Sequence, residues 1–140
     1  MAVFFSYQFP NFRVRNSSAV KCWILKTFKN ERKNLKQLNI VFCSDKFLLS
    51  INKKFLKHNY FTDIVTFYYH KKHEPVEGEI FISVERVKSN SIKFNTPFKD
   101  ELNRVIIHGA LHLCGYKDKS SKEKSTIRKK EDFYLLIRNF

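Results

Sequence analysis

Two hydrophobic patterns alternate along this 140-residue chain, and their alternation limits the possible folds. Short runs rich in β-branched and aromatic residues predict strands, whereas apolar residues spaced three or four apart predict helices. We expect strands at residues 3–9, 38–43, 62–69 and 79–84, the first of them at a sheet edge. We expect helices at residues 17–32, 44–55, 85–94, 97–115 and 121–138. The mixture favours a single α+β domain over residues 1–140, with helices packed on a small mixed β-sheet.

Local signals refine this expectation. Ser17 or Ser18 could cap the first helix, and Ser44 could cap the second. The pair Thr96-Pro97 predicts a helix that has Thr as its capping residue and Pro at its first position. The strand runs 62–69 and 79–84 are separated by the polar loop 70–78. They are therefore close enough in sequence to pair antiparallel.

The chain is strongly basic, with 27 Lys and Arg against 13 Asp and Glu and a formal net charge of +14. This balance favours a polyanionic partner such as nucleic acid, because each neutralised phosphate releases condensed counterions. A solubilising lysine bias would explain the many lysines but not the scarcity of acidic residues. The hydrophobic content of 43% excludes a disordered chain. No run of about 18 apolar residues predicts a membrane span.

The cysteines point to a reducing compartment. The chain has three cysteines, an odd number: Cys22, Cys43 and Cys114. No two of them share a CxxC spacing, which also argues against a disulfide framework. The first eight residues lack the basic region of a signal peptide. We therefore expect a cytoplasmic protein. Cys114 lies two residues after His112, on a different helix face, so we expect it to be buried and structural rather than a metal ligand.

The segment 108–118, HGALHLCGYKD, contains the clearest candidate site. His108 and His112 are four residues apart on a predicted helix, which places both imidazoles on one face with Cβ atoms roughly 6 Å apart. Gly115 lets the chain turn back after the helix, and Asp118 can then return as a third ligand. Three protein ligands leave a fourth position for water, as in catalytic zinc sites. The alternative is two helical histidines and an exposed aspartate without a metal.

The same segment resembles two known signatures. The pattern HxxxHxxGxxD is similar to HExxHxxGxxH of the metzincin peptidases, but Gly109 stands where they carry their general-base Glu. It resembles more closely HGxLHLxGYDH of the YbeY family, the metal-dependent endoribonucleases of rRNA maturation. Residues 51–52 (IN), 62–67 (TDIVTF) and 78–83 (GEIFIS) are similar to that family's LN, PTDVLSF and GDIxIS blocks. The resemblance covers residues 51–118, with order and spacing retained.

Three positions depart from the family pattern. Asp118 replaces the usual third His, Phe61 replaces a Pro before the TD pair, and Leu56 replaces an Arg that is a proposed RNA or phosphate contact. Asp also binds zinc, but the exchange can alter metal preference. Lys57 or His58 could take over the phosphate contact, although Lys does not reproduce the bidentate geometry of Arg.

Other residues could assist the site or contact RNA. Three polar residues upstream of the motif could support the ligands or transfer protons: Asn52, Asp63 and Glu79. Each could instead bind only local backbone or pair with a lysine. The basic run after the motif could contact RNA, although such a run is most often a solvated face; it comprises Lys119, Lys122, Lys124, Arg128, Lys129 and Lys130.

The resemblance implies a single-strand-specific, metal-dependent endoribonuclease. It implies one Zn²⁺ at the end of a central helix, with His108, His112 and Asp118 as ligands and catalytic site. The implied role is rRNA maturation, including 16S rRNA 3′-end processing, and ribosome quality control, with rRNA and the small ribosomal subunit as partners. Two alternatives remain open: a zinc hydrolase of another bond, including a peptidase without the Glu base, and a non-catalytic ribosome-binding module.

Overall fold

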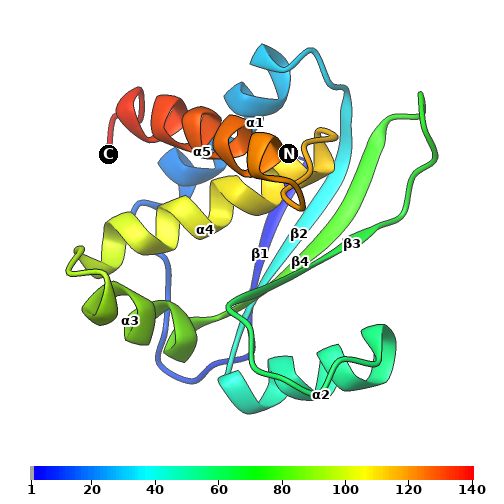
Figure 1. Cartoon of the computed structure of the whole chain (residues 1–140). Coiled ribbons are helices and arrows are strands. Elements are labelled where there is room, and N and C mark those ends of the chain that lie inside the picture. The colour runs from blue at the N-terminus through cyan, green and yellow to red at the C-terminus, as the bar shows by residue number, and fades with distance from the viewer. Residues whose placement is uncertain (1) are drawn as a thin grey trace.

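The computed structural model describes residues 2–140, and this part of the chain contains one mixed sheet with helices packed on it (Figure 1). The strands are β1 (Val3–Tyr7), β2 (Leu35–Cys43), β3 (Ile64–Tyr68) and β4 (Val76–Ser83). The helices are α1 (Ser17–Asn30), α2 (Asp45–Leu56), α3 (Val84–Lys93), α4 (Phe98–Leu113) and α5 (Ser121–Leu136). The strand order is β1-β2-β4-β3, with β3 antiparallel and the other neighbours parallel. The expected α+β architecture and the antiparallel pairing of β3 with β4 are confirmed.

The two faces of the sheet carry different helices. Side chains alternate between the faces along each strand. Ile80 and Ile82 of β4 belong to the main core, which also includes residues of α1, α4 and α5. Val65 of β3 and Phe81 of β4 belong to a smaller cluster against Leu48 of α2. The central helix α4 therefore lies on one face of the sheet, and α2 covers part of the other (Figure 1).

Two glycines allow α4 to lie close against the sheet. A Cβ atom at Gly109 of α4 would lie 2.8 Å from Ile80 Cδ1 and 2.9 Å from Ile64 Cδ1. A Cβ atom at Gly78 of β4 would lie 2.6 Å from Leu113 Cδ2. Real Cβ atoms do not pack this closely, so the absence of these side chains sets the separation of α4 from β3 and β4.

Several strand boundaries differ from those expected from the sequence. β2 begins at Leu35 rather than at residue 38, and β4 begins at Val76, inside the expected loop 70–78. The parallel ladder explains both extensions, because Leu35 pairs with Val76 and Gln37 with Glu77. Pairing with a neighbouring strand thus keeps these residues in β structure, although the local sequence pattern does not predict a strand there.

The helix ends show both correct and incorrect predictions. Ser44 caps α2 as expected, and its hydroxyl accepts a hydrogen bond from the backbone N–H of Phe47. The expected cap of α1 is wrong, because Asn16, in the left-handed conformation, precedes the helix. The expected Thr96 cap of α4 is also wrong: Pro97 is extended, with ψ of 143°, and is itself the capping residue. α5 ends at Leu136 instead of residue 138. No helix within residues 2–140 combines the length and apolarity needed to cross a membrane.

Candidate functional site

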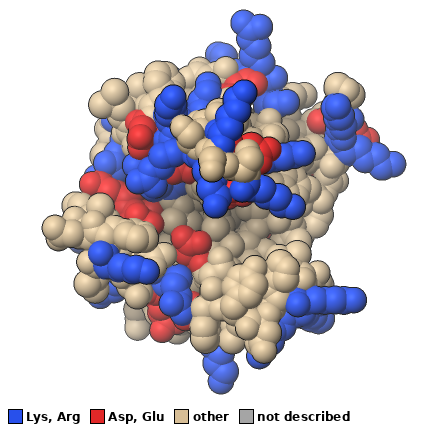
Figure 2. Space-filling model, in the orientation of Figure 1, with Lys and Arg blue, Asp and Glu red and all other residues tan. Residues whose placement is uncertain are grey.

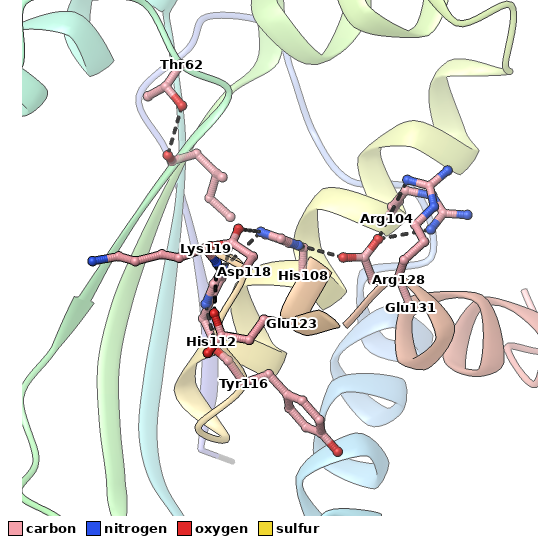
Figure 3. Close-up of polar contacts among 11 residues, drawn as sticks. Thr62, Arg104, His108, His112, Tyr116, Asp118, Lys119, Glu123, Arg128 and Glu131 are labelled. Carbon is pink, nitrogen blue, oxygen red and sulfur yellow. Dashed lines mark hydrogen bonds and ion pairs between the residues drawn. The ribbon is translucent and has the colours of Figure 1, made fainter. Parts of the chain in front are cut away.

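Three side chains converge at the C-terminal end of α4 (Figure 3). His108 and His112 project from successive turns, with their Nε2 atoms 3.0 Å apart. Asp118 lies in the loop between α4 and α5, and its Oδ2 atom is 3.3 Å from each Nε2 atom. These residues form a group that could hold one metal ion. The structure therefore brings together the three residues that the sequence spacing predicted to lie close to one another.

The turn after α4 returns Asp118 to the histidines. Gly115 has a φ of +108°, which a residue with a side chain rarely adopts. Its N–H donates to the His112 carbonyl at 3.0 Å, and the N–H of Tyr116 donates to the Leu111 carbonyl at 3.1 Å. This pair of bonds is a Schellman motif, which satisfies the last carbonyls of the helix and reverses the chain. The expected role of Gly115 is confirmed.

Hydrogen bonds orient both imidazole rings. His112 Nδ1 lies 2.9 Å from the carbonyl oxygen of Tyr116, and His108 Nδ1 lies 2.6 Å from Oε2 of Glu131. Carbonyl and carboxylate oxygens accept hydrogen bonds, so each Nδ1 atom carries the donated proton. Each Nε2 atom then presents a lone pair toward Asp118, as a metal ligand requires.

Glu131 is the functional residue that the sequence analysis missed. It lies on α5, its side chain is only 5% exposed, and Arg104 binds its other oxygen at 2.9 Å. Burial lowers the pKa of His108, but the hydrogen bond and charge of Glu131, together with Asp118, raise it above its ordinary value overall. One signal was available, because Glu131 stands four residues after Ile127 and three before Tyr134, in the apolar stripe of a basic helix.

Two hollows share His108 and Asp118 as lining residues, and His112 lines the first of them. One, of about 380 Å³, extends toward α2 and β3, and the other, of about 340 Å³, extends toward α5. His108, Asp118 and Asp63 line both. Burial raises the pKa of Asp63, although its own backbone and the charge of His108 partly oppose the rise. A carboxyl group with a raised pKa beside the candidate ligands is suited to proton transfer.

Some of the other named residues lie at the first hollow. Asn52 is buried, lines this hollow and donates from Nδ2 to the carbonyl of Tyr60 at 3.0 Å. Its observed role is to hold the segment that follows α2. His58 and the exposed Leu56 also line the hollow. Lys57 ends α2 in the left-handed conformation and does not line it.

The remaining named residues lie away from the converging ligands. Glu79 is on the opposite face of the sheet, where it binds Asn39 and Tyr69 at 3.0 Å each, because alternation turns it away from Ile80. Lys119 and Lys122 are exposed and line neither hollow. Of the basic run, Lys124 and Arg128 line the second hollow, together with Arg104 of α4. Figure 2 shows Lys and Arg gathered over α5, above the hollowed centre of this face.

The described cysteines are consistent with the sequence-based expectation. Cys22, Cys43 and Cys114 are all free thiols. Cys114 is buried, and burial raises the pKa of its thiol to about 12. A thiol that stays protonated in the core is structural, as expected from its position on the helix.

Comparisons with known proteins identify the family. A sequence model of Endoribonuclease YbeY matches residues 9–137. The chain is 44% identical to Endoribonuclease YbeY of Cytophaga hutchinsonii over 138 residues, covering 99% of this chain and 96% of that protein. It is 46% identical to Endoribonuclease YbeY of Karelsulcia muelleri over 131 residues, covering 94% and 92%. A solution structure of a Thermotoga maritima protein superposes with a TM-score of 0.66 at 25% identity, covering 96% and 87%. With its motif, its fold and these relatives in agreement, this chain belongs to the Endoribonuclease YbeY family.

Proposed function

We propose that this chain is a single-strand-specific, metal-dependent endoribonuclease that acts as one domain over residues 1–140. The observation that carries the proposal is the convergence of His108, His112 and Asp118 at the first hollow, with His108 and Asp118 also lining the second. Membership of a family whose relatives are named endoribonucleases supports RNA as the substrate. The net charge of +14 is suited to a polyanion.

The donor atoms fit a zinc ion. Four ligands at about 2.0–2.1 Å in tetrahedral geometry lie roughly 3.3 Å from one another. The three donor atoms of His108, His112 and Asp118 are separated by 3.0 to 3.3 Å. Two imidazoles and one carboxylate are ligands that Zn²⁺ accepts. Zn²⁺ held in such a site would supply Lewis acidity, which lowers the pKa of water toward neutrality.

The protein's own groups prepare this chemistry. Glu131 and the Tyr116 carbonyl fix the orientation of the two imidazoles, so the ligands do not reorganise when the ion binds. Asp63 is placed to accept and return a proton beside the reacting phosphate. Lys124 and Arg128 line the neighbouring hollow, where they can neutralise phosphate charge as it develops in the transition state.

We further propose rRNA as the substrate, with the 3′ end of 16S rRNA as the processed site and the small ribosomal subunit as the partner. The resemblance of residues 51–118 to the rRNA-maturation family supports this assignment. The same resemblance supports a part in ribosome quality control. Free cysteines support action in the reducing cytoplasm.

The structure disfavours the peptidase alternative. Position 109, which carries the general-base Glu in the similar peptidase signature, faces the sheet. Even a Cβ atom there would lie 2.8 Å from Ile80 Cδ1 and 2.9 Å from Ile64 Cδ1. A carboxylate at this position would thus be directed into the core. The alternative of a non-catalytic module is disfavoured by the hollows, because a structural zinc site is normally closed by protein ligands.

Cleavage of a single-stranded fragment of the 16S rRNA 3′ end tests the proposal. The zinc-loaded wild type should cut it, and His112→Ala should not, because the variant lacks one ligand. His73→Ala is a matched control, since His73 is exposed in the loop between β3 and β4 and is not among the three converging residues. Equal cleavage by wild type and His112→Ala would refute the proposed catalytic site.

A further inference from the structure

Exposed hydrophobic residues are concentrated in the segment from Phe55 to Tyr69, part of which lines the first hollow. Of the eleven large hydrophobic side chains that are exposed in residues 2–140, six lie between Phe55 and Tyr69. Two of these six, Tyr60 and Tyr68, are 56% and 52% exposed and line the first hollow together with His108 and His112. Exposed aromatic surface that is concentrated at a hollow marks a binding surface more often than chance exposure does.

The Tyr60 ring is held in place rather than free. Asn52, which is buried, fixes the backbone carbonyl of Tyr60 at 3.0 Å. The His58 ring stacks on Tyr60 with an interplanar angle of 18°, and its Nδ1 atom lies 3.0 Å from the Tyr60 hydroxyl. A ring already ordered in this way loses little conformational entropy when a ligand stacks on it.

Tyr68 reaches the hollow because of strand alternation. It is paired with Gly78 on β4, on the sheet face that carries α4. The next residue, Tyr69, is 57% exposed but turns to the opposite face, where its hydroxyl donates to Glu79 at 3.0 Å. Of these two adjacent tyrosines of nearly equal exposure, only Tyr68 lines the hollow.

The two hollows differ in chemistry. Two tyrosines and no Lys or Arg line the first hollow. The second is lined by Arg104, Lys124 and Arg128, together with one aromatic ring, Phe94, and four carboxylates. Arg104 is paired with Glu131 and Asp132, so Lys124 and Arg128 are the basic residues at the second hollow that are most available to phosphate. A single RNA strand has the same division, with flat apolar bases on one side and phosphates on the other. Bases stack on aromatic side chains in proteins that bind single strands, and basic grooves follow the backbone.

We propose that the first hollow is a base-stacking subsite, in which Tyr60 and Tyr68 hold an unpaired base beside the scissile phosphate. This inference rests on the proposed endoribonuclease function and deepens it by naming the residues that select single strands. A base in a duplex is covered by its neighbours on both faces and paired at its edge, so it cannot enter the hollow without unpairing. Tyr68 is in this scheme a substrate-binding residue and Asn52 a positioning residue for Tyr60.

Direct binding measurements test the subsite. The probe is a short single-stranded RNA carrying a fluorescent base analogue, with a blunt duplex of the same sequence for comparison. Tyr68→Ala should weaken single-strand binding by about 5- to 140-fold, the loss typical of one base–aromatic stack. Tyr68→Phe should retain binding because it keeps the ring. Tyr69→Ala is the matched control and should bind like wild type, and duplex binding should be nearly unchanged in all three variants.

The outcomes separate this inference from the proposed function. Equal single-strand affinity of wild type and Tyr68→Ala would overturn the subsite and leave a protein partner as the occupant of the aromatic hollow. Equal losses for Tyr68→Ala and Tyr69→Ala would also overturn it. The endoribonuclease proposal is judged independently, by whether zinc-loaded wild type cleaves RNA. Unchanged zinc affinity in Tyr68→Ala would confirm that a loss of RNA binding does not come from a disturbed metal site.

Discussion

Replacing Glu131 with Gln should weaken metal binding without removing any ligand. Glu131 accepts the Nδ1 proton of His108 at 2.6 Å and lies almost fully buried on α5. The variant keeps the shape of the side chain but removes its charge. The imidazole then loses the carboxylate that makes it a stronger donor to the metal.

The size of the effect follows from the contacts of Glu131. Loss of a carboxylate that supports a ligating histidine typically costs 10- to 100-fold in metal affinity, or about 1.4 to 2.7 kcal/mol. The Gln carbonyl can still accept from His108, but its amide nitrogen then faces the guanidinium of Arg104, which is also a donor. Because one hydrogen bond is retained and one is lost, we expect a loss of about tenfold for Glu131→Gln.

Competition with a chromogenic zinc chelator at neutral pH measures this loss. Asp132→Asn is the matched control, because Asp132 binds the same Arg104 at 2.7 Å but is exposed and does not contact His108. It should keep the wild-type zinc affinity. A zinc Kd for Glu131→Gln within about twofold of wild type, in a variant with an unchanged circular dichroism spectrum, would refute the claim that Glu131 tunes the site.

Three further predictions concern stability and reactivity. Gly78→Ala should reduce the free energy of unfolding by about 1–3 kcal/mol, because the new methyl group would lie 2.8 Å from the backbone oxygen of Phe67. Urea denaturation measures this loss, and an unchanged midpoint of unfolding would contradict the close packing. Burial raises the pKa of Glu31, but hydrogen bonds from Tyr134 and its neighbours outweigh this and lower it, so the charged form stabilises the fold above the unfolded-state pKa. Glu31→Gln should thus reduce the free energy of unfolding by about 1–3 kcal/mol at pH 7. The difference in stability between this variant and wild type should shrink as pH falls below 4.5, toward the folded-state pKa of Glu31. A difference that stays constant with pH would refute the stabilising role of the charged carboxylate. Only Cys22 should react rapidly with a thiol reagent at pH 8, since burial raises the pKa of the Cys43 and Cys114 thiols to about 12. Rapid labelling of more than one thiol would contradict the burial of these two residues.

The convergence of the three candidate ligands could be predicted because their geometry is local. Helical spacing places His108 and His112 on one face, and the turn at Gly115 brings Asp118 back within a few residues. No distant part of the chain is needed to form this arrangement. The three-residue group could therefore be named before any tertiary structure was known.

The supporting residues could not be placed in the same way, because tertiary packing decides them. Glu131 comes from another helix, and only the contact between α4 and α5 brings it to His108. Glu79 was expected near the site because of its family block, yet the apolar Ile80 and Ile82 of the same strand occupy the face that carries α4. Strict attention to the two-residue period would have placed Glu79 on the other face.

The early start of β4 has a similar cause. Val76 follows a proline in a polar segment, and its own sequence neighbours indicate a loop. Its backbone N–H donates to the carbonyl of Asn34, the residue just before β2, at 2.7 Å, and Val76 pairs with Leu35 at the start of β2. Strand ends that depend on a parallel neighbour are determined by pairing across many residues of sequence.

The three candidate ligands lie in one short stretch of chain, so a metal bound there would not depend on the whole domain staying folded. His108, His112 and Asp118 span eleven consecutive residues, so closing the chelate ring restricts only a short loop and costs little chain entropy. Detachment of α5 would remove Glu131 while leaving the three donor atoms joined through one helix and one turn. A bound ion would then be held more weakly and would dissociate faster, while the sheet is still folded. Local opening of the C-terminal helix would thus set the rate at which zinc exchanges.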